Sequence, residues 1–136
     1  TYQNAKVIWA HVGQIRYPQK QTKYGPSYVD RLLTEHSNIF FDIAVARPGA
    51  KYPGSSYVHN TVQNWNGRVK PEWKDIFEKH SGRFLTGSDI GPDRADTFPE
   101  VIERRRELLS QLSKSTYEKI AFQNAWYLIV GRQWSI

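Results

Sequence analysis

Three short runs of apolar residues, at positions 6–10, 38–45 and 83–88, predict buried strands. The first two are nearly continuous rather than alternating, which is typical of strands covered on both faces, as in parallel sheets. Four stretches with apolar residues at helical spacing lie between and after these runs, beginning near Ser27, Pro71, Thr97 and Ser115. Because strands that alternate with helices form βαβ units, this order predicts an α/β fold with a parallel sheet that ends in two helices.

Local signals support these helices. Ser27 with Asp30, and Thr97 with Glu100, have the form of a capping box, a hydroxyl followed three residues later by a carboxylate. Pro71 suits the first turn of a helix. The last helix has the clearest apolar stripe, formed by Tyr117, Ile120, Ala121, Asn124, Ala125 and Leu128. In this stripe we expect Asn124 to be a buried amide that ties down a loop.

Two long connections, 12–26 and 46–70, leave the carboxyl ends of the first two predicted strands. Loops of this length in a compact domain are usually functional or disordered. Within the second connection, the spacing of Val58, Val62 and Trp65 predicts a short helix.

The composition fits one globular domain of 136 residues, with 39% hydrophobic and 14% aromatic residues. No apolar run approaches the roughly 18 residues that a membrane helix needs, so we expect no membrane partner. Cysteine is absent, which excludes disulfides and cysteine-ligated metals. That absence fits many compartments, of which we favour the cytoplasm. The chain starts at Thr1 rather than Met, and we therefore expect a processed or truncated polypeptide.

The chain carries a net charge of +6 but only one dense basic run, Arg104 to Arg106, set among glutamates. Pairing at helical spacing, Glu100 with Arg104 and Glu103 with Arg106, favours a solvated helix face. A basic, aromatic-rich module for nucleic acid or another anionic ligand stays an alternative. Nucleic acid is disfavoured because most aromatic residues occupy predicted core positions.

Two residues whose side chains could take part in catalysis or metal binding directly follow predicted strands: His11 after the first and Asp89 after the third. In parallel α/β proteins, ligands bind at the carboxyl ends of the strands. Histidine can bind a metal or transfer a proton near neutral pH, and aspartate can bind a metal or take a proton from metal-bound water. We therefore expect both to be catalytic residues and metal ligands, with a hydrogen-bonded structural role as the alternative.

Three further residues are candidates for binding a small-molecule substrate. Asp42 lies inside the second predicted strand, where a carboxylate is either buried with partners or aimed into a site. Arg47 and Arg94 lie just beyond the second and third strands and can hold an anionic group through the planar guanidinium, unless they are plain surface arginines. His59, in the second long connection, is a weaker candidate. Glycine-rich nucleotide motifs, a Gly-x-Ser-x-Gly elbow and a His-x-His pair are absent.

The stretches KVIWAHVG at 6–13, NIFFDIA at 38–44 and GRFLTGSDIG at 82–91 resemble the last three barrel strands of the amidohydrolase-related metal-dependent hydrolases. LLSQL at 108–112 and KIAFQNA at 119–125 are similar to the closing helices of that family. The resemblance implies a (β/α)8 barrel with a divalent metal, often zinc, at its carboxyl face. His11 matches the histidine of the sixth strand, and Asp89 matches the aspartate of the eighth, a metal ligand or the base that activates water.

A complete barrel of this kind has eight strands in roughly 250 residues, and this chain supplies about three strands. The family's His-x-His of the first strand and histidine of the fifth have no counterpart here. We therefore expect residues 1–136 to form one domain, the C-terminal three βα units of a larger barrel, inactive alone. Its open sheet edges are expected to pair with the remainder of the barrel or with copies of itself.

The expected function is therefore that of a metal-dependent hydrolase, which cleaves a C–N, ester or lactone bond with a metal-activated water. Two alternatives from related proteins stay open. One is a decarboxylase, since a branch of the family removes carboxyl groups from aromatic acids without hydrolysis. The other is a structural relative without a metal.

Overall fold

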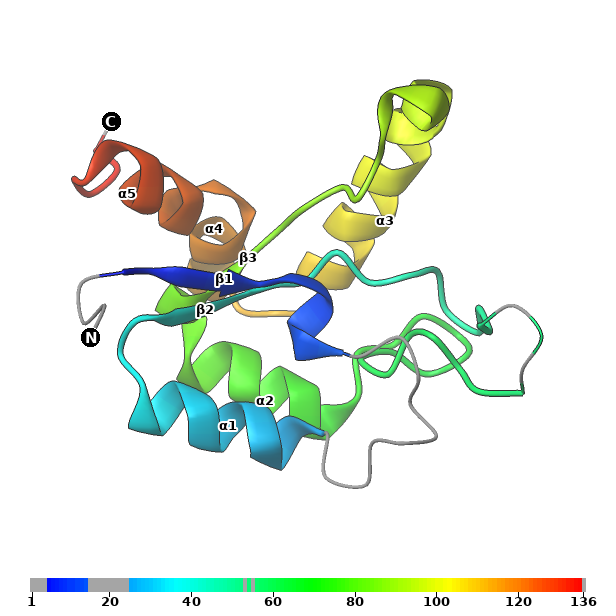
Figure 1. Cartoon of the computed structure of the whole chain (residues 1–136), viewed down its shortest axis with the longest axis horizontal. Coiled ribbons are helices and arrows are strands. Elements are labelled where there is room, and N and C mark those ends of the chain that lie inside the picture. Colours follow the sequence, from blue (N-terminus) through cyan, green and yellow to red (C-terminus); the bar gives the residue numbers. More distant parts are fainter. Residues whose placement is uncertain (1–4, 15–24, 53, 55, 136) are drawn as a thin grey trace.

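Three parallel strands form the sheet, β1 (Val7–Trp9), β2 (Ile39–Asp42) and β3 (Phe84–Leu85), side by side in chain order (Figure 1). The computed structural model describes residues 5–14, 25–52, 54 and 56–135. The mixed α/β fold with a parallel sheet is thus confirmed. Each strand is shorter than predicted, because the chain leaves the sheet soon after its central apolar residues. Most of the first long connection, residues 15–24, lies outside the described residues.

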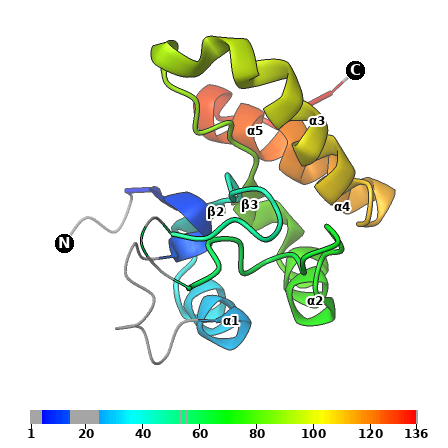
Figure 2. The same ribbon diagram turned by 90° about the vertical axis from the view of Figure 1, so that its right-hand side faces the viewer.

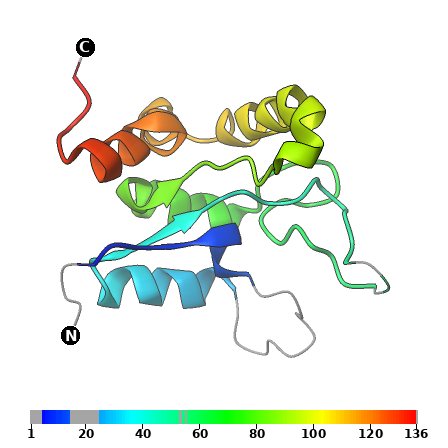
Figure 3. The same cartoon turned by 45° about the horizontal axis from the view of Figure 1, so that its top comes forward.

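Helices make up about 51% of the structure and lie on both sides of the sheet. Figures 2 and 3 show α1 and α2 together on one side, with α3, α4 and α5 on the other. In chain order the helical elements are η1 (Ala10–Gly13), α1 (Pro26–Glu35), α2 (Pro71–Lys79), η3 (Ser81–Arg83), η4 (Pro92–Thr97), α3 (Phe98–Leu109), α4 (Lys114–Glu118), the π-helical η5 (Lys119–Gln123) and α5 (Asn124–Val130). None of the described helices is long and apolar enough to cross a membrane.

A row of aromatic rings joins the three strands to α2. The Phe41 ring lies 5.9 Å from Trp9 and 6.1 Å from Phe84, measured between ring centres, and both pairs are stacked. Phe77 of α2 meets Phe84 edge to face at 4.8 Å. Aromatic pairs in such geometries add to the stabilisation from burial alone. The main core therefore lies between the sheet and the helices α1 and α2.

The strand β1 lies at the edge of the sheet and is more exposed than its sequence predicts. Val7, Ile8 and Trp9 are 47%, 54% and 38% exposed, whereas Phe40 and Phe41 of β2 are buried on opposite faces. The expectation of cover on both faces is thus confirmed for β2 and wrong for β1. An apolar run shows that a strand can be buried, but a neighbouring element has to supply the cover.

The two predicted capping boxes are not formed. At α1, Pro26 occupies the first turn, and the Ser27 hydroxyl makes no capping bond. Asp30 instead binds Lys79 and His80 of the neighbouring helix end. At α3, Thr97 makes no side-chain cap, and Glu100 pairs along the helix. The boxes fail because Ser27 lies inside the helix, one residue after Pro26, and because Thr97 has helical φ and ψ (−83°, −4°) rather than the extended values of an N-cap.

The last helical stretch begins earlier than predicted and contains a π-helical turn. Ser113 caps it, with its hydroxyl accepting a hydrogen bond from the Thr116 N–H at 3.3 Å. The predicted core amide is confirmed: Asn124 Nδ2 donates to the carbonyls of Ser81 and Phe84, each at 2.7 Å. These bonds tie the end of the chain to the start of β3.

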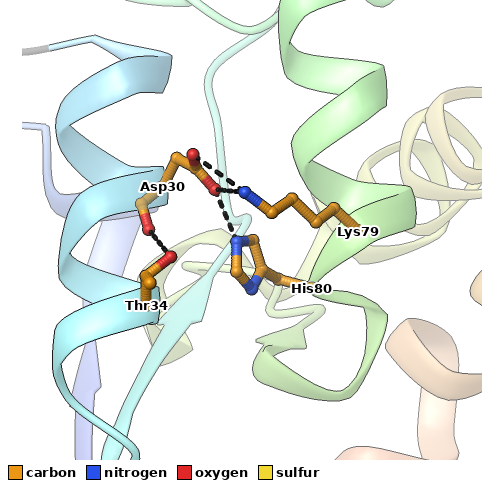
Figure 4. A network of polar contacts seen from close by, with 4 residues as sticks. All are labelled: Asp30, Thr34, Lys79 and His80. Carbon is orange, nitrogen blue, oxygen red and sulfur yellow. Dashed lines mark hydrogen bonds and ion pairs between the residues drawn. The ribbon is translucent and has the colours of Figure 1, made fainter.

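A polar cluster joins α1 to the end of α2, as Figure 4 shows. Lys79 Nζ donates to Asp30 Oδ1 at 2.8 Å, and His80 Nε2 lies 2.6 Å from the same oxygen. The hydrogen bond from Lys79 and then that from His80 hold the pKa of Asp30 below its ordinary value of 3.8. Thr34 donates to the Asp30 backbone carbonyl and makes no contact that competes for the carboxylate.

Replacing this carboxylate should weaken the fold only above acidic pH. Asp30→Asn is expected to lower the free energy of unfolding by about 1 kcal/mol or less at pH 7, because the pair is partly exposed. The bonds that hold the pKa of Asp30 below 3.8 stabilise the fold above that pH, and their contribution is lost as the pH falls through the folded-state pKa, so the difference should shrink as the pH falls below 3.8. Urea unfolding at pH 7 and pH 3 measures both points. Asp75→Asn, an exposed carboxylate on α2, is the control, and an equal loss in both variants would refute the assignment.

Candidate functional site

Strained backbone marks the carboxyl ends of β1 and β3. Among the described residues, the non-glycine positions with positive φ are His11 at 56°, Val12 at 58° and Asp89 at 54°. This region is uncommon for side chains other than glycine, and a β-branched valine there is an outlier. Such residues persist only where the surrounding structure holds them, and they cluster at functional sites. The two residues singled out by sequence, His11 and Asp89, are thus both in this conformation.

Tight packing holds the turn after β1 in place. Val12 is fully buried in the core. The next residue, Gly13, also has a positive φ, and a Cβ atom there would lie 2.9 Å from the Phe41 ring. The close approach of backbone to ring therefore requires glycine. Through this contact the aromatic row sets the position of His11.

A hydrogen bond orients the His11 ring. Its Nδ1 lies 2.8 Å from the carbonyl oxygen of Ala44, just beyond β2. A carbonyl oxygen only accepts, so Nδ1 carries the proton, and Nε2 of the neutral ring keeps its lone pair. Metal-binding histidines commonly show this arrangement, which raises the basicity of the free nitrogen.

His11 and Asp89 line one pocket of about 370 Å³ at the carboxyl edge of the sheet. His59 lines the same pocket, although it is far from both in sequence. Arg94 also lines this pocket, and its Nη2 donates to the backbone carbonyl of Asp89 at 3.0 Å. The volume suits a small-molecule ligand.

The loop 46–70 brings His59 to the pocket through a buried amide. Asn60 accepts hydrogen bonds from the N–H groups of Val62 and Gln63 and donates to the Ala46 carbonyl at 2.7 Å. The predicted short helix is wrong, because this loop forms isolated antiparallel bridges instead, and Trp65 is 84% exposed. The two bonds that Asn60 accepts are those of an Asx turn, a local signal that sequence reasoning missed, whereas its bond to Ala46 depends on the path of the loop.

Burial is the main reason that the pKa of His59 lies below its ordinary value of 6.5. The charge of His11 lowers the pKa further, and the Asp89 carboxylate opposes both effects. The Tyr52 ring, 4.3 Å from the His59 ring centre, adds to the burial. His59 is therefore neutral at pH 7.

Two of the predicted substrate-binding residues do not line the pocket. Arg47 is exposed, and Asp42 lies beneath the pocket, where Oδ1 accepts the N–H of Ala44. The other Asp42 oxygen lies against Gly87, where a Cβ atom would come within 2.5 Å of it. Asp42 thus supports the backbone that holds His11, which favours the structural role left open by the sequence.

Sequence reasoning missed Arg105, the most deeply buried charged residue described. The predicted ion pairs of Arg104 and Arg106 are present, so the solvated-face interpretation is confirmed for Arg106, but it is wrong for Arg105. Arg105 is only 6% exposed, and its Nε donates to the Gly87 carbonyl at 3.0 Å. A signal was available: position 105 lies in the apolar stripe of α3 together with Val101, Leu108, Leu109 and Leu112. Burial is the main cause that lowers the pKa of Arg105.

The side chains fit part of a metal site. The free nitrogen of His11 and the Asp89 carboxylate are donors that zinc accepts. Among the residues that the structure describes, however, no three His, Asp or Glu side chains are grouped closely enough to hold an ion. A complete site would need further ligands from outside this set.

Comparison with known proteins adds no relative. No family model, curated protein or solved structure matches the chain. Functional inference therefore depends on the geometry of the pocket and on the motifs of the sequence.

The contact between Gly87 and Asp42 gives a first test of this site. Gly87→Ala is expected to lower the free energy of unfolding by about 1–3 kcal/mol, because the new methyl group overlaps the Asp42 carboxylate, which has to move and disturb its bond to the Ala44 N–H. Gly82→Ala is the matched control, since a Cβ atom there meets nothing within 4 Å. Urea unfolding measures both. Equal stability of the two variants would contradict the close packing.

The low pKa of His59 gives a second test. Its imidazole proton signals, followed by NMR, should titrate below pH 6.5. Asp89→Asn should lower that midpoint further, because the carboxylate favours the charged ring, and His11→Gln should raise it. A His59 midpoint that neither variant moves would show that the three side chains do not share a site.

Proposed function

We propose that the chain is part of a metal-dependent hydrolase of the amidohydrolase type, which cleaves a C–N, ester or lactone bond of a small molecule with an activated water. One observation carries this proposal: His11 and Asp89, which have positive φ and lie two and four residues beyond the ends of β1 and β3, line the same pocket. The sequence resemblance assigns the same two positions to the catalytic centre of that family.

In this proposal His11 presents Nε2 to the reacting group. The bond from Nδ1 to the Ala44 carbonyl keeps the ring from rotating and excludes the other neutral tautomer. The nitrogen can therefore serve as a ligand for a divalent metal such as zinc. A bound ion of this kind supplies Lewis acidity, polarising a carbonyl and lowering the pKa of water.

In this proposal Asp89 transfers the proton. Its carboxylate takes a proton from the attacking water and returns it to the leaving group, as a general base and then a general acid. The Arg94 guanidinium, bonded to the Asp89 carbonyl, holds the strained backbone of that residue. Asp89 can also be a metal ligand. Both the ligand role and the acid–base role require its carboxylate beside the site where the metal and the water would bind.

The strands are parallel and adjacent in chain order, with α1 and α2 on one side (Figure 1). Consecutive units of a (β/α)8 barrel share this order with open α/β sheets that carry helices on both faces. In a barrel, the exposed apolar residues of β1 would be covered by further strands, from the rest of a longer chain or from a second copy. The same segments would supply the missing metal ligands.

A charge-matched pair of variants tests the proposal. In the intact enzyme assayed with zinc on p-nitrophenyl esters and lactones, Asp89→Asn is expected to reduce kcat by about 10²–10⁴-fold, because the proton acceptor is lost. Asp93→Asn, four residues away with a side chain 79% exposed, should leave kcat unchanged. Thermal unfolding of both variants checks that each is folded. Full turnover by folded Asp89→Asn would overturn the proposal.

A further inference from the structure

We propose that Arg104 and Arg105 form a binding site for an oxyanion, the carboxylate or phosphate group of a small ligand, inside the pocket that also holds His11 and Asp89. The proposal rests on the hydrolase function only where it makes this ligand the substrate. In that case it names the substrate class: a small molecule with an anionic group at one end and the scissile bond at the other.

Among the described residues, Arg105 is a buried cation with no carboxylate within hydrogen-bond distance, and the charges of Asp42 and Asp89 favour it only from further away. Its side chain is 6% exposed and lines the pocket. Among the described residues it makes one hydrogen bond, from Nε to the Gly87 carbonyl, and no ion pair. The two terminal nitrogens are therefore left for another partner. A buried, unpaired guanidinium is costly, and proteins keep such a group where a partner of opposite charge binds.

Arg104 adds a second guanidinium to the lining of the same pocket. Its Nη1 pairs with Glu100, and its buried Nε has no partner among the described residues. The charge of Arg104 disfavours that of Arg105, while the Asp42 and Asp89 carboxylates favour it. An anion that accepts from the terminal nitrogens of Arg105 would place a negative charge beside both guanidinium groups.

The geometry of the donors selects the chemistry of the ligand. A guanidinium is planar and offers pairs of parallel N–H groups, which match the two oxygens of a carboxylate or a phosphate. The pocket lining contains three arginines, at positions 94, 104 and 105, against two carboxylates, Asp89 and Glu100. The balance of fixed charge thus favours an anion, and the volume of about 370 Å³ limits it to a small molecule.

The binding test uses two probes on the whole chain, inorganic phosphate and benzoate, at 0.15 M ionic strength. Isothermal titration calorimetry should detect binding of at least one probe. Arg105→Gln should weaken that binding at least tenfold, whereas Arg106→Gln should change it less than twofold. Arg106 is the matched control, because it removes the same charge from the same helix but is exposed and outside the pocket.

A second measurement on the unmodified protein covers the case in which Arg105→Gln does not fold. The arginine Nε–H signals of residues 104 and 105 should shift on titration with the bound probe, and that of Arg106 should not. Binding of phosphate alone identifies a phosphate ligand, and binding of benzoate alone identifies a carboxylate. No shift with either probe, or equal losses in the two variants, overturns the proposal.

The anion site and the hydrolase function fail separately. Asp89→Asn should tighten the binding of the probe, since it keeps both arginines and removes a negative charge from the pocket. Retained probe binding with no hydrolase activity in the unmodified protein would refute the hydrolase and keep the anion site. Hydrolysis of neutral esters without any probe binding would refute the anion site and keep the hydrolase function.

Discussion

The stacking of Phe41 between Trp9 and Phe84 is the contact on which the rest of the structure depends. It joins all three strands, and Phe77 extends it to α2. Because the strands are parallel and held in one register, their carboxyl ends meet at one edge of the sheet. The same ring of Phe41 packs against Gly13 and so sets the turn that carries His11. The packing of the core therefore also determines the position of the proposed catalytic histidine.

Close packing around Asp42 links the proposed catalytic site to the proposed anion site. The Asp42 carboxylate lies against Gly87 and bonds to the N–H of Ala44. The carbonyl of Ala44 orients His11, and the carbonyl of Gly87 holds Arg105. A shift of this one carboxylate would thus move both the histidine ring and the guanidinium. Groups that act on one substrate need such shared support, since small displacements are costly in catalysis.

Parts of this architecture were predictable because their causes are local. Apolar runs of strand length, Pro71 at a helix start and the stripe that contains Asn124 are short-range patterns, and the structure has the corresponding elements. Position at a strand end was equally informative for His11 and Asp89, because parallel topology alone brings such residues to one edge. The capping boxes failed, since α1 begins before Ser27 and the chain enters α3 from η4 with Thr97 already in a helical conformation.

By itself, then, the sequence determined the order and kind of the elements, the parallel sheet and the two strand-end residues, because backbone propensity and hydrophobic periodicity act over a few residues. The tertiary structure alone decided that β1 stays exposed, that Asn60 brings His59 into the pocket, and that Arg105 is buried while Arg106 is not. Burial of a charge depends on which face of α3 packs against the sheet. The apolar stripe around position 105 indicates that face, but whether an arginine on it is buried or reaches solvent is a balance of desolvation against core packing over the whole molecule.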